Sequence, residues 1–222
     1  SSLVHRLDFS EDRFVETTGS GVVVSFTDVA GRATNPQVFG SPTYERRVHA
    51  GLNGVKFSSD GSYLSMTAVG GQEPEVFVVY RVFEYKDKGL ILSHAGSTVT
   101  SYGFGTYSQG GVGKVGVVRS SGASLASVDA ATEKWHVANV YYGKNDGFVD
   151  VNNGSSTDAL NTQSKFNANA LTKIQIGGSK FAGHDVSNVV GEVLVFDSKL
   201  SDADRASVRK RLMTKWDVPT PD

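Results

Sequence analysis

Cysteine is absent from the 222-residue chain, and proline occurs only 5 times. The absence of cysteine excludes disulfide bonds, thiolate zinc sites, thiol nucleophiles and iron–sulfur clusters. The 22 Lys and Arg residues nearly balance the 23 Asp and Glu residues, which gives a formal net charge of −1. We therefore expect no general attraction to nucleic acid or anionic lipid. No apolar run approaches the roughly 18 residues of a membrane span, so we also expect no membrane insertion.

Glycine is abundant, with 25 residues, and hydrophobic residues make up 39% of the chain. This composition suits a sizeable core built from many short strands that glycine turns connect. Short apolar runs recur at nearly regular spacing, and the longest, at residues 75–85, is rich in Val, Phe and Tyr, as a central strand should be. The pattern predicts an all-β sandwich or jelly roll. Since neither a repeat nor a long linker divides the sequence, we expect a single domain over residues 1–222.

One helix is predicted at the C-terminal end, over about residues 201–216. Ser201 is a suitable N-cap, and Asp202 and Asp204 place negative charge in the first turn. An apolar stripe recurs every four residues and consists of Val208, Leu212 and Trp216. The basic residues gather in the second half, where they favour the helix dipole: Arg209, Lys210, Arg211 and Lys215. We expect the stripe to pack against a sheet.

A recognisable pattern occupies four segments in the second half of the chain. They are residues 135–142 (WHVANVYY), 148–154 (FVDVNNG), 174–178 (IQIGG) and 191–197 (GEVLVFD), followed by the expected helix. On these segments the chain resembles the laminin-G-like (LamG) branch of the concanavalin A-like lectin/glucanase superfamily. The resemblance implies a two-sheet antiparallel jelly-roll sandwich with one C-terminal α-helix. Members of the superfamily bind sugars, bind proteins or serve as adhesion modules on cell surfaces and phage particles, and fold alone does not choose among these roles.

Some relatives of this fold are enzymes, but the sequence contains little that indicates a catalytic site. Glucanases use the strand motif E-x-D-x-x-E, which pairs two carboxylates on one face, and this motif is missing. Glu73, Glu75 and Glu84 lie instead at the ends of the expected strand 76–83. A polysaccharide lyase needs a base and a group that neutralises a substrate carboxylate. Residues of suitable type are Tyr80, Arg81, Gln109 and His136, although their spacing demands no such arrangement. We assign no catalytic residue.

Aromatic residues and glycines alternate over residues 102–107 (YGFGTY). In a strand, Tyr102, Phe104 and Thr106 face one side. Aromatic rings stack on the C–H faces of sugars, and glycines let a ligand approach the backbone. Tyr102, Phe104 and Tyr107 are therefore candidate glycan-binding residues. The alternative is a core strand in which glycine relieves crowding, and the sequence leaves both open.

A calcium ion is the one cofactor that the resemblance suggests, because LamG relatives often bind calcium through oxygen ligands at the rim of the sandwich. Asp146 and Asp150 are the candidate ligands, beside the turn at Asn152, and Asp28 is a further candidate carboxylate. Turn capping is the alternative role for these residues. The five histidines are scattered, which argues against zinc.

These observations predict a non-catalytic binding or adhesion module that recognises surface glycans, displayed on a phage particle or secreted by a bacterium. The expected location is therefore extracellular or on a virion surface. One alternative is a structural or decoration protein whose sandwich contacts neighbouring protein subunits, and another is a polysaccharide lyase or glycosidase. Because a single sugar contact is weak, we expect a homo-oligomer or a surface array. The sequence begins at Ser1 without Met, so we expect a processed product or an excised piece.

Overall fold

The computed structural model describes most of the chain. The described residues are 2–58, 61–67, 73–86, 89–94, 102–109, 112–119, 124–143, 147–152, 154–155, 173–178 and 186–219. Within them, no helix has the length and apolar character that crossing a membrane requires.

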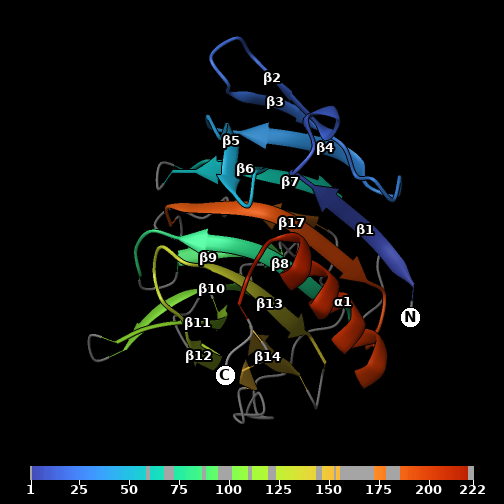
Figure 1. Cartoon of the computed structure of the whole chain (residues 1–222), viewed down its shortest axis with the longest axis vertical. Helices are drawn as coiled ribbons and strands as arrows, with labels where there is room; N and C mark the ends of the chain where they lie inside the picture. The colour runs from blue at the N-terminus through green and yellow to red at the C-terminus, as the bar shows by residue number, and fades with distance from the viewer. Residues whose placement is uncertain are drawn as a thin grey trace.

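The strands form two large antiparallel sheets and one small sheet (Figure 1). The eight-stranded sheet has the order β15-β14-β13-β8-β17-β6-β5, with β1 also paired to β17. Its strands are β1 (Leu3–Asp8), β5 (Thr43–His49), β6 (Leu52–Phe57), β8 (Glu75–Val82), β13 (Trp135–Tyr141), β14 (Phe148–Val151), β15 (Gly154–Ser155) and β17 (Asn188–Phe196). The seven-stranded sheet has the order β12-β11-β10-β9-β16-β7-β4. Its strands are β4 (Thr34–Phe39), β7 (Tyr63–Thr67), β9 (Gly89–His94), β10 (Tyr102–Gln109), β11 (Val112–Arg119), β12 (Ser124–Asp129) and β16 (Lys173–Ile176).

The remaining elements are small apart from one helix. They are the strand pair β2 (Val15–Thr17) and β3 (Val23–Phe26), the 3-10 turn η1 (Asp12–Phe14) and the helix α1 (Asp202–Lys215). The arrangement confirms the predicted all-β, two-sheet antiparallel jelly-roll sandwich with one C-terminal helix.

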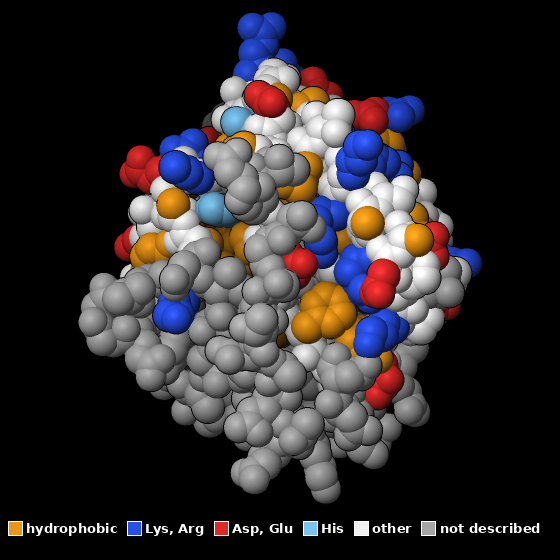
Figure 2. All heavy atoms as spheres, turned by 60° about the horizontal axis from the view of Figure 1, so that its bottom comes forward, with side chains coloured by type: hydrophobic (Ala, Val, Ile, Leu, Met, Phe, Trp, Pro, Cys, Tyr) orange, Lys and Arg blue, Asp and Glu red, His pale blue; other side chains and the backbone are white. Residues whose placement is uncertain are grey.

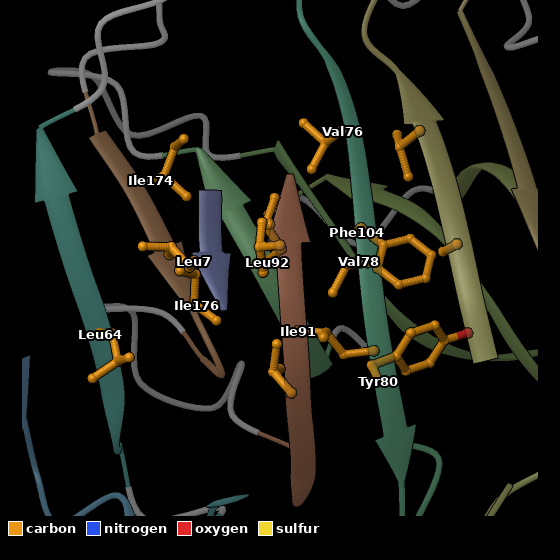
Figure 3. Packing of buried hydrophobic residues seen from close by; sticks show 14 of the residues in the cluster. Leu7, Leu64, Val76, Val78, Tyr80, Ile91, Leu92, Phe104, Ile174 and Ile176 are labelled. Atoms are coloured by element: carbon orange, nitrogen blue, oxygen red, sulfur yellow. The ribbon is translucent and has the colours of Figure 1, made fainter. Parts of the chain in front are cut away.

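The main core lies between the two large sheets (Figure 3). On β8, side chains alternate between the two faces, so that Val76, Val78 and Tyr80 point into this core. They meet side chains of the opposite sheet that include Leu92 and Phe104. The rings of Tyr80 and Phe104 are in edge-to-face contact, with their centroids 5.2 Å apart. The inward-pointing side chains of the two sheets therefore hold the sandwich together, while the central strands of the eight-stranded sheet are buried on both faces.

Helix α1 covers the outer face of the eight-stranded sheet, where a second hydrophobic cluster forms. Leu212, Met213 and Trp216 from the helix and its C-cap pack with residues of β8, β13 and β17. The Trp216 ring stacks on Trp135 with centroids 5.2 Å apart. The predicted burial of Leu212 and Trp216 is confirmed, whereas Val208 is only half-buried.

The predicted start of the helix is also confirmed. Ser201 has extended backbone angles, and its hydroxyl accepts a hydrogen bond from the Asp204 N–H at 3.2 Å. Asp202 and Asp204 occupy the first turn, where negative charge interacts favourably with the helix dipole. This local capping chemistry fixes where α1 begins on the sheet.

Because Leu212 is buried between α1 and the sheet, replacing it with alanine should destabilise the protein. Leu212→Ala is expected to lower the free energy of unfolding by about 2–5 kcal/mol, the usual range for a large-to-small change in a core. Chemical denaturation monitored by Trp fluorescence measures this difference. The neighbouring exposed residue offers a control, since Arg211→Ala should leave stability close to that of the wild type. A loss of under about 0.5 kcal/mol for Leu212→Ala, the scale of surface substitutions, would mean that the helix is a solvated appendage.

Candidate functional site: a groove between helix α1 and strand β14

A groove runs along helix α1 beside strand β14, and we call it the α1–β14 groove. It consists of two adjoining hollows of about 300 Å³ and about 540 Å³, which share Ala206 and Arg209. The smaller hollow is lined by Phe148, Asp150, Asp202, Arg205, Ala206 and Arg209. The larger is lined by Ala206, Arg209, Lys210, Met213, Thr214, Asp217 and Val218. Sites for small molecules commonly have volumes of roughly 300–1,000 Å³, so the groove has the size of a ligand site.

Local structure explains why these side chains converge. On β14, Val149 and Val151 point into the core, which turns the alternate residues Phe148 and Asp150 outward. On α1, Arg205 and Arg209 are one helical turn apart and share a face. On the molecular face that Figure 2 shows, Lys and Arg side chains gather beside acidic and hydrophobic ones. The groove thus combines an aromatic ring with fixed charges.

Arg205 is held rigidly at the inner wall of the groove. Its Nε donates to Glu75 Oε1 at 2.7 Å, and its Nη2 donates to Glu75 Oε2 at 3.2 Å and to the Leu200 carbonyl at 2.9 Å. Its Nη1 also donates to Asp202. Burial lowers the pKa of Arg205, but the hydrogen bonds and charges of Glu75 and Asp202 outweigh burial and raise this pKa above its ordinary value. The guanidinium Cζ lies 4.7 Å from the centroid of the Phe148 ring, which fixes the plane of both groups.

Arg209 and Asp150 form a second ion pair where the two hollows meet. Arg209 Nη2 donates to Asp150 Oδ2 at 2.6 Å, and the side chains are only 11% and 13% exposed. Three basic residues and three acidic residues line the whole groove: Arg205, Arg209, Lys210, Asp150, Asp202 and Asp217. Charge is therefore balanced along the groove, and ion pairs hold Arg205, Arg209 and Asp150 in place.

Asp150, one of the two predicted calcium ligands, is part of this second ion pair. The cation that Asp150 binds is the guanidinium of Arg209, so calcium would have to displace an ion pair to use this carboxylate. Asp146 lies outside the described residues. Within the described ranges, no group of three or more Asp, Glu or His side chains could hold a metal ion. Calcium binding through Asp146 and Asp150 stays a prediction, tested by comparing the melting temperature in chelator and in calcium.

Asp28, the further candidate carboxylate, caps a turn. Its oxygens accept hydrogen bonds from the N–H groups of Arg6 and Ala33, both at 2.8 Å, and of Ala30 at 3.1 Å, and lie 2.9 Å from His5 Nδ1. Burial raises the pKa of Asp28, but these donors outweigh burial and lower it to about 2. The turn-capping alternative is confirmed for this residue.

The glycan-stacking prediction for Phe104 is wrong. Phe104 is fully buried and packs on Tyr80 in the core between the sheets. A Cβ on Gly105 would lie 2.0 Å from the Gly89 carbonyl oxygen, so this glycine lets β10 approach β9 and does not open the backbone to a ligand. The alternative of a core strand therefore holds here. The side chains of Tyr102 and Tyr107 lie outside the described residues, so their role stays a prediction.

Among the residues considered for a lyase, the described part of the chain brings Tyr80 and His136 together, with their ring centroids 5.6 Å apart. Tyr80 is fully buried, and His136 is buried with both ring nitrogens engaged. His136 Nε2 donates to the Ala131 carbonyl at 2.8 Å, while Nδ1 accepts from Asn152 Nδ2 at 2.9 Å. Burial lowers the pKa of His136, which agrees with this neutral tautomer. The side chain of Gln109 lies outside the described residues.

Comparisons with known proteins identify the fold. No protein-family model and no curated protein matches the chain. Among solved structures, domain 4 of AbnA, a GH43 extracellular arabinanase from Geobacillus stearothermophilus in complex with arabinotriose, superposes with a TM-score of 0.70 at 10% identity. The match covers 94% of this chain and 98% of that one.

Two larger proteins contain a similar domain. Trypanosoma rangeli sialidase matches with a TM-score of 0.65 at 17% identity, over 96% of this chain and 33% of its own. The receptor binding domain of botulinum neurotoxin D matches with a TM-score of 0.59 at 12% identity, over 96% of this chain and 53% of that one. The chain thus spans about a third of the first protein and half of the second. At these identities the likeness establishes a shared β-sandwich fold, and membership of the LamG branch stays a prediction.

Proposed function

We propose that this protein is a carbohydrate-binding domain that takes an uncharged oligosaccharide in the α1–β14 groove. The observation that carries the proposal is the Phe148 ring beside a balanced set of fixed carboxylates and guanidiniums in a hollow of ligand size. Sugar hydroxyls both donate and accept hydrogen bonds, and a ring C–H face packs well on an aromatic side chain. Because the charges of the groove cancel, it offers a charged ligand no net attraction. The β-sandwich fold supports the proposal, since domain 4 of AbnA was solved with arabinotriose.

The groove is organised before any ligand arrives. Glu75 holds Arg205 from the buried side, and Arg209 and Asp150 fix each other. A preorganised site loses little side-chain entropy on binding, which favours affinity. Affinity for one site should nevertheless be weak, about high-micromolar to millimolar, so function would depend on many copies. The proposed setting is extracellular, on a cell or virion surface, where such an array can form.

A glycan array followed by calorimetry with the best uncharged oligosaccharide tests the proposal. Phe148→Ala should weaken binding about tenfold, which corresponds to ~1.4 kcal/mol and matches a typical aromatic contact. Asp202→Asn should also weaken binding while leaving the melting temperature close to that of the wild type, because this carboxylate is fully exposed and Glu75 still holds Arg205. Val24→Ala, which truncates an exposed hydrophobic residue outside the groove, is the control and should bind as the wild type does.

Three results would contradict the proposal. One is the absence of glycan binding by both the monomer and a multivalent display. Another is binding that neither groove variant weakens. The third is release of reducing ends or unsaturated sugars from a polysaccharide, which would establish an enzyme in place of a binding domain.

A further inference from the structure

The larger hollow of the α1–β14 groove differs in its chemistry from the smaller one. The smaller hollow has the Phe148 ring in its wall, whereas none of the described residues that line the larger hollow is aromatic. The two hollows adjoin, so a sugar chain with one ring on Phe148 has its next ring in the larger hollow. The lining of the larger hollow therefore determines which neighbouring sugar the groove accepts.

The C-terminal end of α1 builds the floor of the larger hollow. Trp216 is the C-cap, and Asp217 follows in the left-handed region with a φ of 47°. The Val218 N–H donates to the Met213 carbonyl at 3.0 Å, and the Asp217 N–H donates to the Thr214 carbonyl at 3.5 Å. These are the two hydrogen bonds of a Schellman motif, which commonly brings an apolar side chain after the turn against the last turn of the helix. Met213 and Val218 accordingly belong to one hydrophobic cluster and share the floor.

This floor is small and apolar. Met213 and Val218 are each only 5% exposed, so the floor can cover a methyl group but not the face of a whole sugar ring. A sugar hydroxyl placed there would lose its hydrogen bonds to water and gain none from the floor. A methyl group placed there leaves water without that cost. The floor therefore favours a sugar that carries a methyl group.

Polar groups that have no partner flank the floor. Lys210 precedes Met213 by three residues and Asp217 follows it by four, so each lies about one helical turn from the floor. Both residues are exposed, and within the described part of the chain neither the Lys210 ammonium nor the Asp217 carboxylate has a hydrogen-bond or ion-pair partner. Arg209 of the same hollow, by contrast, already binds Asp150. The hollow thus offers a free donor and a free acceptor on opposite sides of an apolar floor.

We propose that the larger hollow binds the acetamido group of a neutral N-acetylated amino sugar whose neighbouring ring stacks on Phe148. An acetamido group carries a methyl group, a carbonyl oxygen that accepts and an N–H that donates, and the last two point in opposite directions because the amide is trans. The methyl group lies on Met213 and Val218. The carbonyl oxygen accepts from Lys210, and the N–H donates to Asp217. This inference rests on the proposed function and names the class of sugar that the groove selects.

A matched pair of neutral trisaccharides tests the inference. Triacetylchitotriose and cellotriose have the same rings and linkages, but the first carries acetamido groups where the second carries hydroxyls. Calorimetry with the full chain should give triacetylchitotriose an affinity about tenfold higher, which corresponds to ~1.4 kcal/mol. Nuclear magnetic resonance titration should place the amide shifts of both ligands in residues 148–150 and 202–218.

Two variants test which residues produce the preference. Asp217→Gly removes the acceptor and should bring the two affinities close together. Because glycine is the usual residue at this left-handed position, the variant should fold at least as stably as the wild type, which its melting temperature checks. Val218→Thr replaces a floor methyl group with a hydroxyl of similar size and should also reduce the preference. Val24→Ala, outside the groove, is the control and should keep the full preference.

The outcomes separate this inference from the proposed function. Equal affinities for the two trisaccharides, with shifts in the groove, would overturn the inference and leave the proposed function standing. A preference that survives both Asp217→Gly and Val218→Thr would overturn it as well. An equal preference for L-fucose over L-galactose, a pair that differs by a methyl group without an amide, would assign the floor to a methyl group alone and overturn the acetamido assignment. Shifts outside the groove with every ligand would overturn the proposed function itself.

Discussion

Replacing Glu75 with alanine should lower the free energy of unfolding by about 3–5 kcal/mol, as expected when one partner of a buried ion pair is removed. Glu75 is completely buried and accepts hydrogen bonds from Arg205, from Asn139 Nδ2 at 2.9 Å and from the Leu200 N–H at 2.8 Å. The alanine variant leaves the buried Arg205 guanidinium without its main counter-charge. It also frees the first turn of α1 from the sheet, since Leu200 directly precedes the N-cap. Urea denaturation of the two proteins at neutral pH measures the difference.

Two further variants separate the ion pair from simple loss of contact. Asp202→Ala removes the exposed partner of the same guanidinium and should leave stability close to that of the wild type. The double variant Glu75→Leu, Arg205→Met replaces the whole pair with apolar groups and should recover much of the loss, because both desolvation penalties disappear together. A loss of only about 1 kcal/mol for Glu75→Ala, the level of a surface ion pair, would contradict the argument.

The helix and its docking could be predicted because the information is local. Ser201, the first-turn carboxylates and the spacing of Leu212 and Trp216 act within a few residues of one another, and the structure places them as expected. The sequence interpretation missed the role of the arginines. Arg209 was expected to favour the helix dipole, yet its guanidinium is buried against Asp150, and Arg205 is buried against Glu75.

These partners lie far apart in the sequence, which explains why the groove could not be predicted. The separation is 130 positions for Arg205 and Glu75 and 59 positions for Arg209 and Asp150. Nothing in a local pattern specifies which strand meets which helix face. One signal for the groove was present in the sequence. Arg205 and Arg209 are spaced i, i+4 on the helix face that also carries Leu212 and Met213. A charge on such a buried face needs a buried partner.

The error at Phe104 has a different cause. Alternation in a strand tells which residues share a face, but not which face is inside. Glycines next to an aromatic ring are compatible with an open ligand platform and with two strands packed closely together. The packing of β10 against β9, and of Phe104 against Tyr80, shows that Phe104 points into the core.

Several residues that carry the family resemblance turn out to hold the sandwich and helix together. The Asn152 side chain joins the start of β13 by accepting from the Val137 N–H at 2.8 Å and donating to His136. A Cβ on Gly191 would come within 2.3 Å of the Trp216 ring, so glycine is needed for this tryptophan to lie on β17. The motif is therefore strong evidence for the fold and weak evidence for a ligand. This explains why the fold was predictable while the site was not.

Replacing Lys215 with methionine should destabilise the protein by about 3–5 kcal/mol at neutral pH, because two buried carboxylates lose their shared cation. Asp8 and Glu192 lie directly opposite each other on β1 and β17, and both are almost completely buried. Lys215 Nζ donates to Asp8 at 2.8 Å and to Glu192 at 2.7 Å. Arg6 also pairs with both carboxylates, but alone it cannot neutralise two charges that face each other across a sheet.

The destabilisation by Lys215→Met should depend on pH. Burial raises the pKa of Asp8, but hydrogen bonds from Lys215 and Ser10 and the charge of Lys215 outweigh burial and lower it. In the wild type, Asp8 therefore stabilises the fold above its unfolded pKa of roughly 3.9, and this contribution is lost as pH falls through the lower folded value. Without Lys215, burial acts with less opposition, so the folded variant accepts a proton on Asp8 more readily.

The stability deficit of Lys215→Met should consequently be largest near pH 7 and shrink as the pH falls toward the unfolded pKa of Asp8. Urea denaturation of wild type and variant at pH 7 and near pH 4 measures this change. Lys210→Met, an exposed lysine of the same helix, is the matched control and should show little effect at either pH. An equal deficit at both pH values would show that Lys215 stabilises through the packing of its aliphatic stem and not through the two carboxylates.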